Sequence, residues 1–156
     1  MRTRELALEE KIFFREILKD LNLPRFTDEK LHRTLDRVVY HDTADGGTWN
    51  PIVRTAMRRG FAAITLGPNI YFNVGFFPKP CENLTLQCHE LVHACQAASF
   101  GFGTAFWVLR YFGSWIRFPY SNIPYEKQAC EMEENLRRRL DDEPELRNLL
   151  SRQNRT

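Results

Sequence analysis

The chain has 156 residues, 43% of them hydrophobic and 13% aromatic, which is enough to bury the core of one domain without disulfide staples. Its net charge of +2 comes from 22 basic and 20 acidic residues, and so weak a field gives no reason to expect nucleic acid as a partner. The four cysteines form no CxxC pair, and we expect free thiols in a reducing compartment.

The N-terminal stretch and the longest uncharged run bear on location. MRTRELALEEKIFFREILKDL is charged throughout and lacks the apolar region of a signal peptide, so we expect a cytoplasmic chain, with export by another route left open. The longest run without a charged side chain, Leu91 to Leu109, carries a histidine, a glutamine and two glycines. We therefore expect no membrane span.

Helical and extended patterns alternate in the first sixty residues. Apolar residues at helical spacing predict an amphipathic helix from Thr3 to about Leu21, and Thr27 is a suitable N-cap for a second helix. The β-forming residues Val38 to Tyr40 predict a short strand that ends near His41. A third helix is expected from Trp49 to Arg59, with a proline in its first turn.

Two features lie around that third helix. His41, Asp42 and Asp45 in the segment HDTADGG are a weak signal for a second metal site, and ordinary turn chemistry explains them more simply. Farther along, the β-rich runs Phe61 to Leu66 and Ile70 to Val74 flank the turn residues Gly-Pro-Asn. This pattern predicts a β-hairpin.

The stretch NLTLQCHELVHACQAAS carries the main chemical signal. His89 and His93 are four residues apart, so on a helix both imidazoles leave one face and can grip one metal ion. Glu90 then lies beside the pair, within reach of a water on that ion, and zinc suits such a site because it lowers the pKa of bound water to about 7. The alternative is a helix with two ordinary histidines. The apolar residues on both sides of the motif count against that alternative, because they predict a buried helix. Buried histidine and glutamate side chains are costly unless they bind an ion or another polar group. Asn83 is the expected N-cap.

The region after this helix divides into an aromatic segment and a charged helix. Residues 100–118 are rich in aromatic side chains; core packing is their favoured role, and a wall facing substrate or a surface for a protein partner is the alternative. Ser121 or Asn122 is expected to cap a helix that has Pro124 in its first turn and runs to about Asp141. A last short helix is expected from Pro144 to Arg152.

Two histidines alone do not hold a catalytic zinc ion, so a third protein ligand is required. The downstream helix offers Glu126 in its first turn, where a carboxylate can be aimed into a cleft. Glu133 is nearly in line with Glu126 on a regular helix, whereas Glu131 points about 140° away. We therefore predict Glu126 as the third ligand.

Three segments together resemble a known family. ITLGPNIYF, CHELVHACQ and NIPYEKQAC, within about residues 61–135, are similar to the bacterial zincin metallopeptidase-like domains of the gluzincin type that are associated with contractile injection systems and toxins. The resemblance implies that His89, His93 and Glu126 bind Zn²⁺ and that Glu90 is the general base. It also implies that Ile70 to Val74 form an edge strand against which an extended peptide lies.

The chain also departs from the family pattern. Cys130 stands where gluzincins often place an aspartate that orients a ligand histidine, so that Glu133 or a backbone carbonyl would have to replace it. Gln96 matches the family, and it either bonds a ligand or substrate or is a polar residue at the rim.

We therefore expect residues 1–156 to form one α+β zincin-like domain, a short twisted sheet packed against the metal helix with additional flanking helices. The expected function is zinc-dependent hydrolysis of a peptide or protein substrate, with Glu90 as the base and Tyr125 as a candidate oxyanion donor beside Tyr120 and Arg117. The alternative is a non-catalytic zinc-binding module that serves interaction or assembly.

Overall fold

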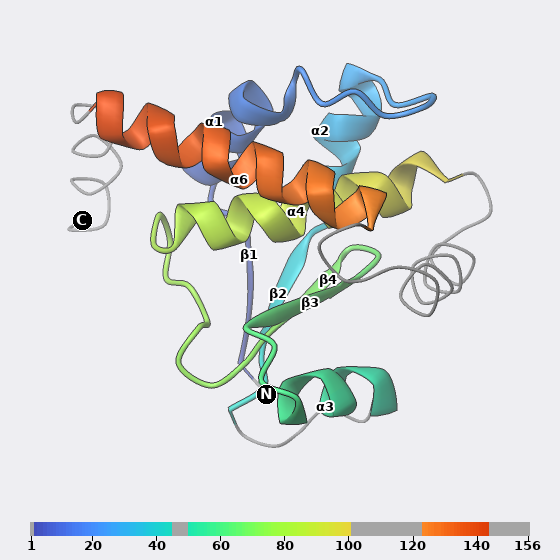
Figure 1. The fold of residues 1–156 in the computed structure, drawn as a ribbon, viewed down its shortest axis with the longest axis vertical. Coiled ribbons are helices and arrows are strands. Elements are labelled where there is room, and N and C mark those ends of the chain that lie inside the picture. The colour runs from blue at the N-terminus through green and yellow to red at the C-terminus, as the bar shows by residue number, and fades with distance from the viewer. Residues whose placement is uncertain (1, 45–49, 101–122, 144–156) are drawn as a thin grey trace.

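The computed structural model describes residues 2–44, 50–100 and 123–143, and these form an α+β fold of helices around a small mixed sheet (Figure 1). Among the described residues, none of the helices combines the length and apolar content that a bilayer span requires. The elements in chain order are β1 (Thr3–Glu5), α1 (Leu8–Leu18), α2 (Asp28–Arg37), β2 (Val39–Asp42), α3 (Pro51–Arg58), β3 (Ala63–Leu66), β4 (Asn69–Phe72), α4 (Leu84–Ser99) and α6 (Pro124–Asp142).

Helix α4 lies at the centre of the fold. It contacts strands β3 and β4 on one side, and it also packs against α2 and most extensively against α6. Figure 1 shows α6 running along α4 on the side away from the sheet, with α1 and α2 behind them and α3 at the opposite end of the sheet. Because α4 is covered in this way, the side chains from Gln87 to Ala97 are all buried.

The sheet has the strand order β1-β2-β4-β3. Strands β3 and β4 form the predicted antiparallel hairpin, while β2 pairs with β4 in parallel and with β1 in antiparallel orientation. The expectation that residues 70–74 form an edge strand is therefore wrong, because β4 lies between β2 and β3. Among the described strands, β3 has a neighbour on one side only.

The N-terminus differs from the prediction. Thr3–Glu5 pair with β2 instead of beginning a helix, and α1 starts at Leu8. The buried carboxylate of Glu10 fixes this start, because it accepts a hydrogen bond of 2.9 Å from the backbone N–H of Ala7. Thr27 caps α2 as predicted, through a bond from the Lys30 N–H, and the predicted short strand corresponds to β2.

Other helix ends also correct the sequence prediction. Asn83 precedes α4 in the left-handed conformation (φ 51°), and its side chain makes no capping bond, so the predicted Asn83 cap is wrong. Helix α6 starts at Pro124 with Ile123 at the N-cap position, in place of Ser121 or Asn122. Those two residues, Asp45, most of the aromatic segment and the short helix expected from 144 onward lie outside the described residues.

Candidate metal centre

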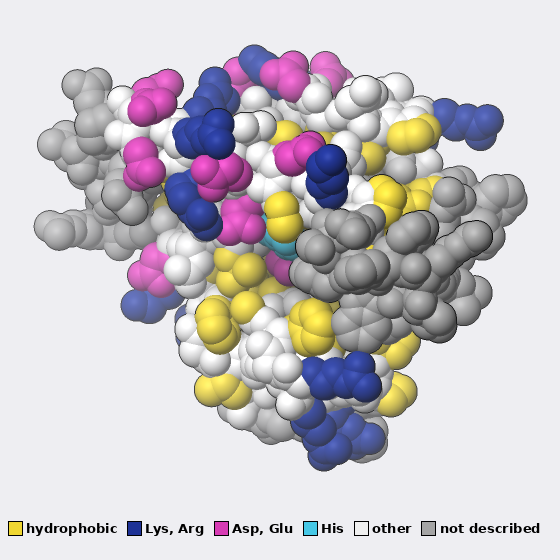
Figure 2. All heavy atoms as spheres, in the orientation of Figure 1, with side chains coloured by type: hydrophobic (Ala, Val, Ile, Leu, Met, Phe, Trp, Pro, Cys, Tyr) yellow, Lys and Arg dark blue, Asp and Glu magenta, His cyan; other side chains and the backbone are white. Residues whose placement is uncertain are grey.

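Two imidazoles of α4 meet at one point. Nε2 of His89 lies 3.2 Å from Nε2 of His93, as the four-residue spacing predicts. His93 is the more deeply buried, and the side chain of His89 keeps 11% of its surface exposed. Figure 2 shows histidine surface reaching solvent between hydrophobic and acidic side chains. The pair is therefore enclosed by protein and still open on one side.

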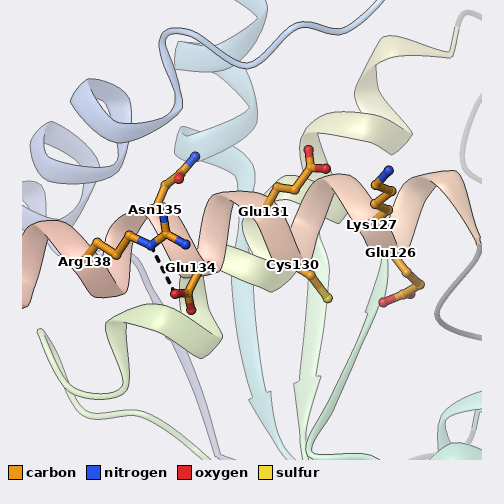
Figure 3. A pocket seen from close by; sticks show the side chains of 7 residues that line it. All are labelled: Glu126, Lys127, Cys130, Glu131, Glu134, Asn135 and Arg138. Carbon is orange, nitrogen blue, oxygen red and sulfur yellow. Dashed lines mark hydrogen bonds and ion pairs between the residues drawn. The ribbon is translucent and has the colours of Figure 1, made fainter.

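Glu126 brings a carboxylate from α6 to the same point. Its Oε2 lies 3.4 Å from Nε2 of His89, and its Oε1 lies 3.3 Å from Nε2 of His93. The side chain is only 2% exposed. Figure 3 shows Glu126 and Cys130 pointing to the same side of α6, and Glu131 pointing to the opposite side. Among Glu126, Glu131 and Glu133, the glutamates considered from the sequence, Glu126 is the one that lies at the Nε2 atoms of both histidines.

The spacing of these three side chains fits a metal ion. Ligand atoms about 2.0–2.1 Å from a tetrahedral zinc ion lie about 3.3–3.4 Å from one another. The contacts between the three side chains measure 3.2 to 3.4 Å, and the two that involve Glu126 run through its two different carboxylate oxygens. Among the described residues, His89, His93 and Glu126 are also the group of side chains whose donor atoms converge closely enough to hold a metal. Two imidazoles and a carboxylate form a donor set that leaves one position open on zinc.

Gln96 orients His93 from the next turn of α4. Its Oε1 lies 2.8 Å from Nδ1 of His93, while its Nε2 donates to the carbonyl of Tyr125 and to Oε1 of Gln128, both at 3.0 Å. Because the amide nitrogen faces two acceptors, Oε1 must face the imidazole, and Nδ1 of His93 must carry the proton. The lone pair of Nε2 then points to the convergence point. Gln96 is fully buried, so the interpretation as a rim residue is wrong.

Glu133 performs the corresponding task for His89. Its Oε2 lies 3.2 Å from Nδ1 of His89, and its Oε1 accepts a bond of 2.9 Å from Arg137. This carboxylate is one of the two replacements considered for the usual aspartate, whose place Cys130 takes. Cys130 itself is exposed and lines a pocket along α6. The described residues that line this pocket are Glu126, Lys127, Cys130, Glu131, Glu134, Asn135 and Arg138 (Figure 3).

The electrostatics of the cluster favour positive charge. Burial lowers the pKa of His89, but the hydrogen bond with Glu126 and the negative charges of the neighbouring carboxylates outweigh burial and raise the pKa to about 8. The same carboxylates that favour a proton on this imidazole also favour a cation held between the three donors.

Glu90 lies on the same turn as His89 and is 5% exposed. Its Oε2 accepts a hydrogen bond of 2.6 Å from the hydroxyl of Thr65 on β3. Thr65 could not be singled out from the sequence, where the only signal is a threonine at an inward position of a β-rich run. The carboxylate of Glu90 is thus tied to the sheet, apart from the three converging donors.

Tyr125 is the catalytic candidate whose chemistry is least defined. Its ring packs edge-on against Phe100, with 6.0 Å between ring centroids, and its carbonyl accepts the bond from Gln96. These contacts hold the first turn of α6 beside α4. The role of the Tyr125 hydroxyl as an oxyanion donor stays a prediction. The other two candidate donors, Tyr120 and Arg117, lie outside the described residues.

The weak signal for a second metal site has a simpler explanation. Nε2 of His41 bonds Oδ1 of Asn69 at 2.8 Å, and its ring stacks on Tyr71. Asp42 accepts a bond from the backbone N–H of Ala44, as in an ordinary turn. His41 and Asp42 therefore have local roles in the sheet and its following turn.

No protein-family model matches this chain, and no curated protein or solved structure matches it either. The resemblance to gluzincin-type domains therefore rests on the three sequence segments alone. What supports a function is the geometry of the cluster itself.

Proposed function

We propose that the protein is a zinc-dependent hydrolase of peptide bonds. The observation that supports this most directly is the separation of two kinds of acidic group: Glu126 joins the two histidines, while Glu90 remains outside the three donors. A site that only binds metal has no use for a second carboxylate beside the first histidine. A hydrolytic site needs one as a general base.

Each described side chain has a defined part in this proposal. His89, His93 and Glu126 hold the ion through two nitrogens and one carboxylate. Bound zinc supplies a Lewis acid that lowers the pKa of a water molecule and polarises a carbonyl oxygen. Glu90 accepts the proton of the attacking water and passes it to the leaving amine. Tyr125 is the described candidate for a donor to the oxyanion that forms.

The substrate of the proposed reaction is an extended peptide. Strand β3 is the sheet edge next to Glu90, because Thr65 of this strand contacts that carboxylate. A peptide that adds to β3 by backbone hydrogen bonds would pass close to the base. Strand β3 thus takes the place of residues 70–74 as the edge proposed to bind the peptide.

A non-catalytic zinc-binding module is the competing function. Three features of the sequence favour it: the replacement of the usual aspartate by Cys130, the short chain, and the aromatic segment 100–118 as a protein-binding surface. Glu133 now contacts His89 in place of that aspartate, which removes the first of these reasons. The two functions make the same prediction about metal and opposite predictions about catalysis.

Metal analysis and peptide cleavage test the proposal together. Purified protein should contain one zinc per chain, and His89→Ala or His93→Ala should lose it. The zinc-loaded wild type should cleave members of an unbiased library of fluorogenic peptides, and Glu90→Gln should bind zinc normally and cleave none. Full zinc content in either histidine variant contradicts the metal site. Zinc binding without cleavage by the wild type supports the non-catalytic module.

A further inference from the structure

A row of side chains crosses all four strands beneath α4. The register places Arg4 opposite Tyr40, Tyr40 opposite Ile70, and Ile70 opposite Thr65. Tyr40 and Ile70 are fully buried, and Thr65 is 3% exposed. Because alternate residues of a strand face opposite sides of a sheet, all four members of the row face α4. Two members of the row, Tyr40 on β2 and Thr65 on β3, carry hydroxyl groups.

Thr65 meets the proposed base directly. Its Oγ1 lies 2.6 Å from Oε2 of Glu90 and 3.2 Å from the backbone carbonyl of the same residue. A hydroxyl has one proton, and the shorter of the two contacts, with Oε2, has the length of a well-formed O–H···O hydrogen bond. The bond engages Oε2 and holds the carboxylate of Glu90 against β3.

A second bond fixes the same face of α4. The hydroxyl of Tyr40 donates to Oε1 of Gln87 at 2.8 Å, and Gln87 lies three residues before Glu90. Residues three apart share one face of a helix. Two members of the row therefore hold two neighbouring side chains of α4, which sets both the rotation of the helix and its position along the sheet.

We propose that Thr65 is the positioning residue of Glu90: its hydroxyl holds one carboxylate oxygen so that the other faces the reacting water. This inference rests on the proposed function. It predicts that loss of the hydroxyl lowers kcat while KM and zinc affinity stay unchanged, because Thr65 contacts neither the three donors nor an oxygen that the metal would need. Misplacement of a catalytic group by about 1 Å lowers a rate by up to about 100-fold.

Three single variants test it in the zinc-loaded protein. Thr65→Val removes the hydroxyl with little change in shape, and Thr65→Ser keeps it. Thr43→Val is the matched control, because Thr43 is also buried and its hydroxyl donates to the backbone carbonyl of Phe72 at 2.9 Å, away from Glu90. With a library peptide that the wild type cleaves, Thr65→Val should lose about 10- to 100-fold in kcat. Thr65→Ser and Thr43→Val should stay within about threefold of the wild type. Equal kcat for Thr65→Val and the wild type overturns the inference.

A thermal-unfolding cycle tests the contact without any substrate. Thr65→Val is expected to lower Tm in the wild-type background and to have a much smaller effect in the Glu90→Ala background, because the partner is then already absent. Equal Tm losses in the two backgrounds overturn the inference whatever the cleavage assay gives. A wild type that cleaves nothing overturns the proposed hydrolase and, with it, the positioning of a base. The cycle then shows separately whether the Thr65–Glu90 bond exists.

Discussion

Glu133 reaches Nδ1 of His89 from the helix that also supplies Glu126. The two glutamates are seven residues apart, so they lie on one face of α6 and approach the same imidazole at its two nitrogens. One helix thus provides both a candidate metal donor and the group that contacts the other nitrogen of a second candidate donor, His89.

Removal of Glu133 is expected to weaken zinc binding. Glu133→Ala frees Nδ1 of His89 from its acceptor, and loss of such an orienting group typically lowers metal affinity by about 10- to 100-fold. Glu134→Ala is the control, because Glu134 binds only Arg137 and Arg138 among the ion pairs of the described residues. Competition titrations with a chromophoric chelator measure both. Equal affinities in the two variants would contradict the role of Glu133.

Removal of Gln96 is also expected to weaken zinc binding, because Gln96 orients His93. Gln96→Ala removes the acceptor that fixes the protonated nitrogen of His93, and we expect a loss of about 10-fold or more in zinc affinity. Gln128→Ala removes only one of the two acceptors of the Gln96 amide, and Tyr125 retains the other. That variant should bind zinc within about threefold of the wild type. If Gln128→Ala is the more damaging change, the assignment of the His93 proton is wrong.

Glu126 and Glu131 give the sharpest test of the third donor. Glu126→Gln should lose most of its zinc affinity, and its Tm should no longer rise when zinc is added, because a ligand stabilises the folded state only when its concentration is well above its Kd. Glu131→Gln should retain both properties, since its exposed side chain points away from Glu126 (Figure 3). Isothermal titration and thermal unfolding with and without zinc separate the two. Weakened binding in Glu131→Gln alone would reverse the assignment.

Acid stability should depend on Glu10, whose side chain is fully buried. Burial raises the pKa of Glu10, but hydrogen bonds from Arg4 and from the backbone N–H groups of Cys81 and Ala7 outweigh burial and lower the pKa below 4.5. A carboxyl group with a lowered folded-state pKa contributes stability above its unfolded pKa, and this contribution is lost as the pH falls through the folded value. Glu10→Gln should therefore be less stable than the wild type at pH 7, and the difference should shrink below about pH 4.5.

The measurement is urea unfolding as a function of pH. At pH 7 we expect a loss of roughly 3 kcal/mol for Glu10→Gln, because the buried end of the Arg4 pair is removed. Glu9→Gln, a change at the exposed neighbour of Glu10, should leave the pH dependence intact. A constant difference between Glu10→Gln and the wild type from pH 7 to pH 3 would contradict the prediction.

Spacing and turn residues in the sequence predicted the histidine pair, its approach by Glu126 and the β-hairpin. The four-residue spacing of His89 and His93 predicted their convergence, and the position of Glu126 after Pro124 predicted its approach to them. The turn residues between the two β-rich runs predicted the hairpin of β3 and β4, which is confirmed. The α+β class is confirmed as well. The histidine pair and the hairpin depend on contacts that are close in sequence, whereas Glu126 reaches the histidines through the packing of α6 on α4.

Features that depend on contacts between distant segments could not be predicted in this way. Thr3–Glu5 form a strand only because β2 offers a partner, and their sequence suits the start of a helix equally well. The place of β4 inside the sheet follows from its parallel pairing with β2, which no periodicity encodes. Threonine is a common residue in strands, so the sequence does not distinguish Thr65, and its hydrogen bond with Glu90 depends on the packing of β3 against α4. Glu133 was identified only as one of two possible partners for a histidine.

The division of the cluster between α4 and α6 also has a consequence for the folding reaction. The two imidazoles approach each other as soon as α4 is helical, but Glu126 joins them only when α6 has docked against it. Contacts between segments far apart in sequence form late, because the chain between them must first be closed. If the cluster binds zinc as proposed, high-affinity uptake should follow helix docking in time, and the rate at which a refolding chain acquires zinc should report on this last assembly step.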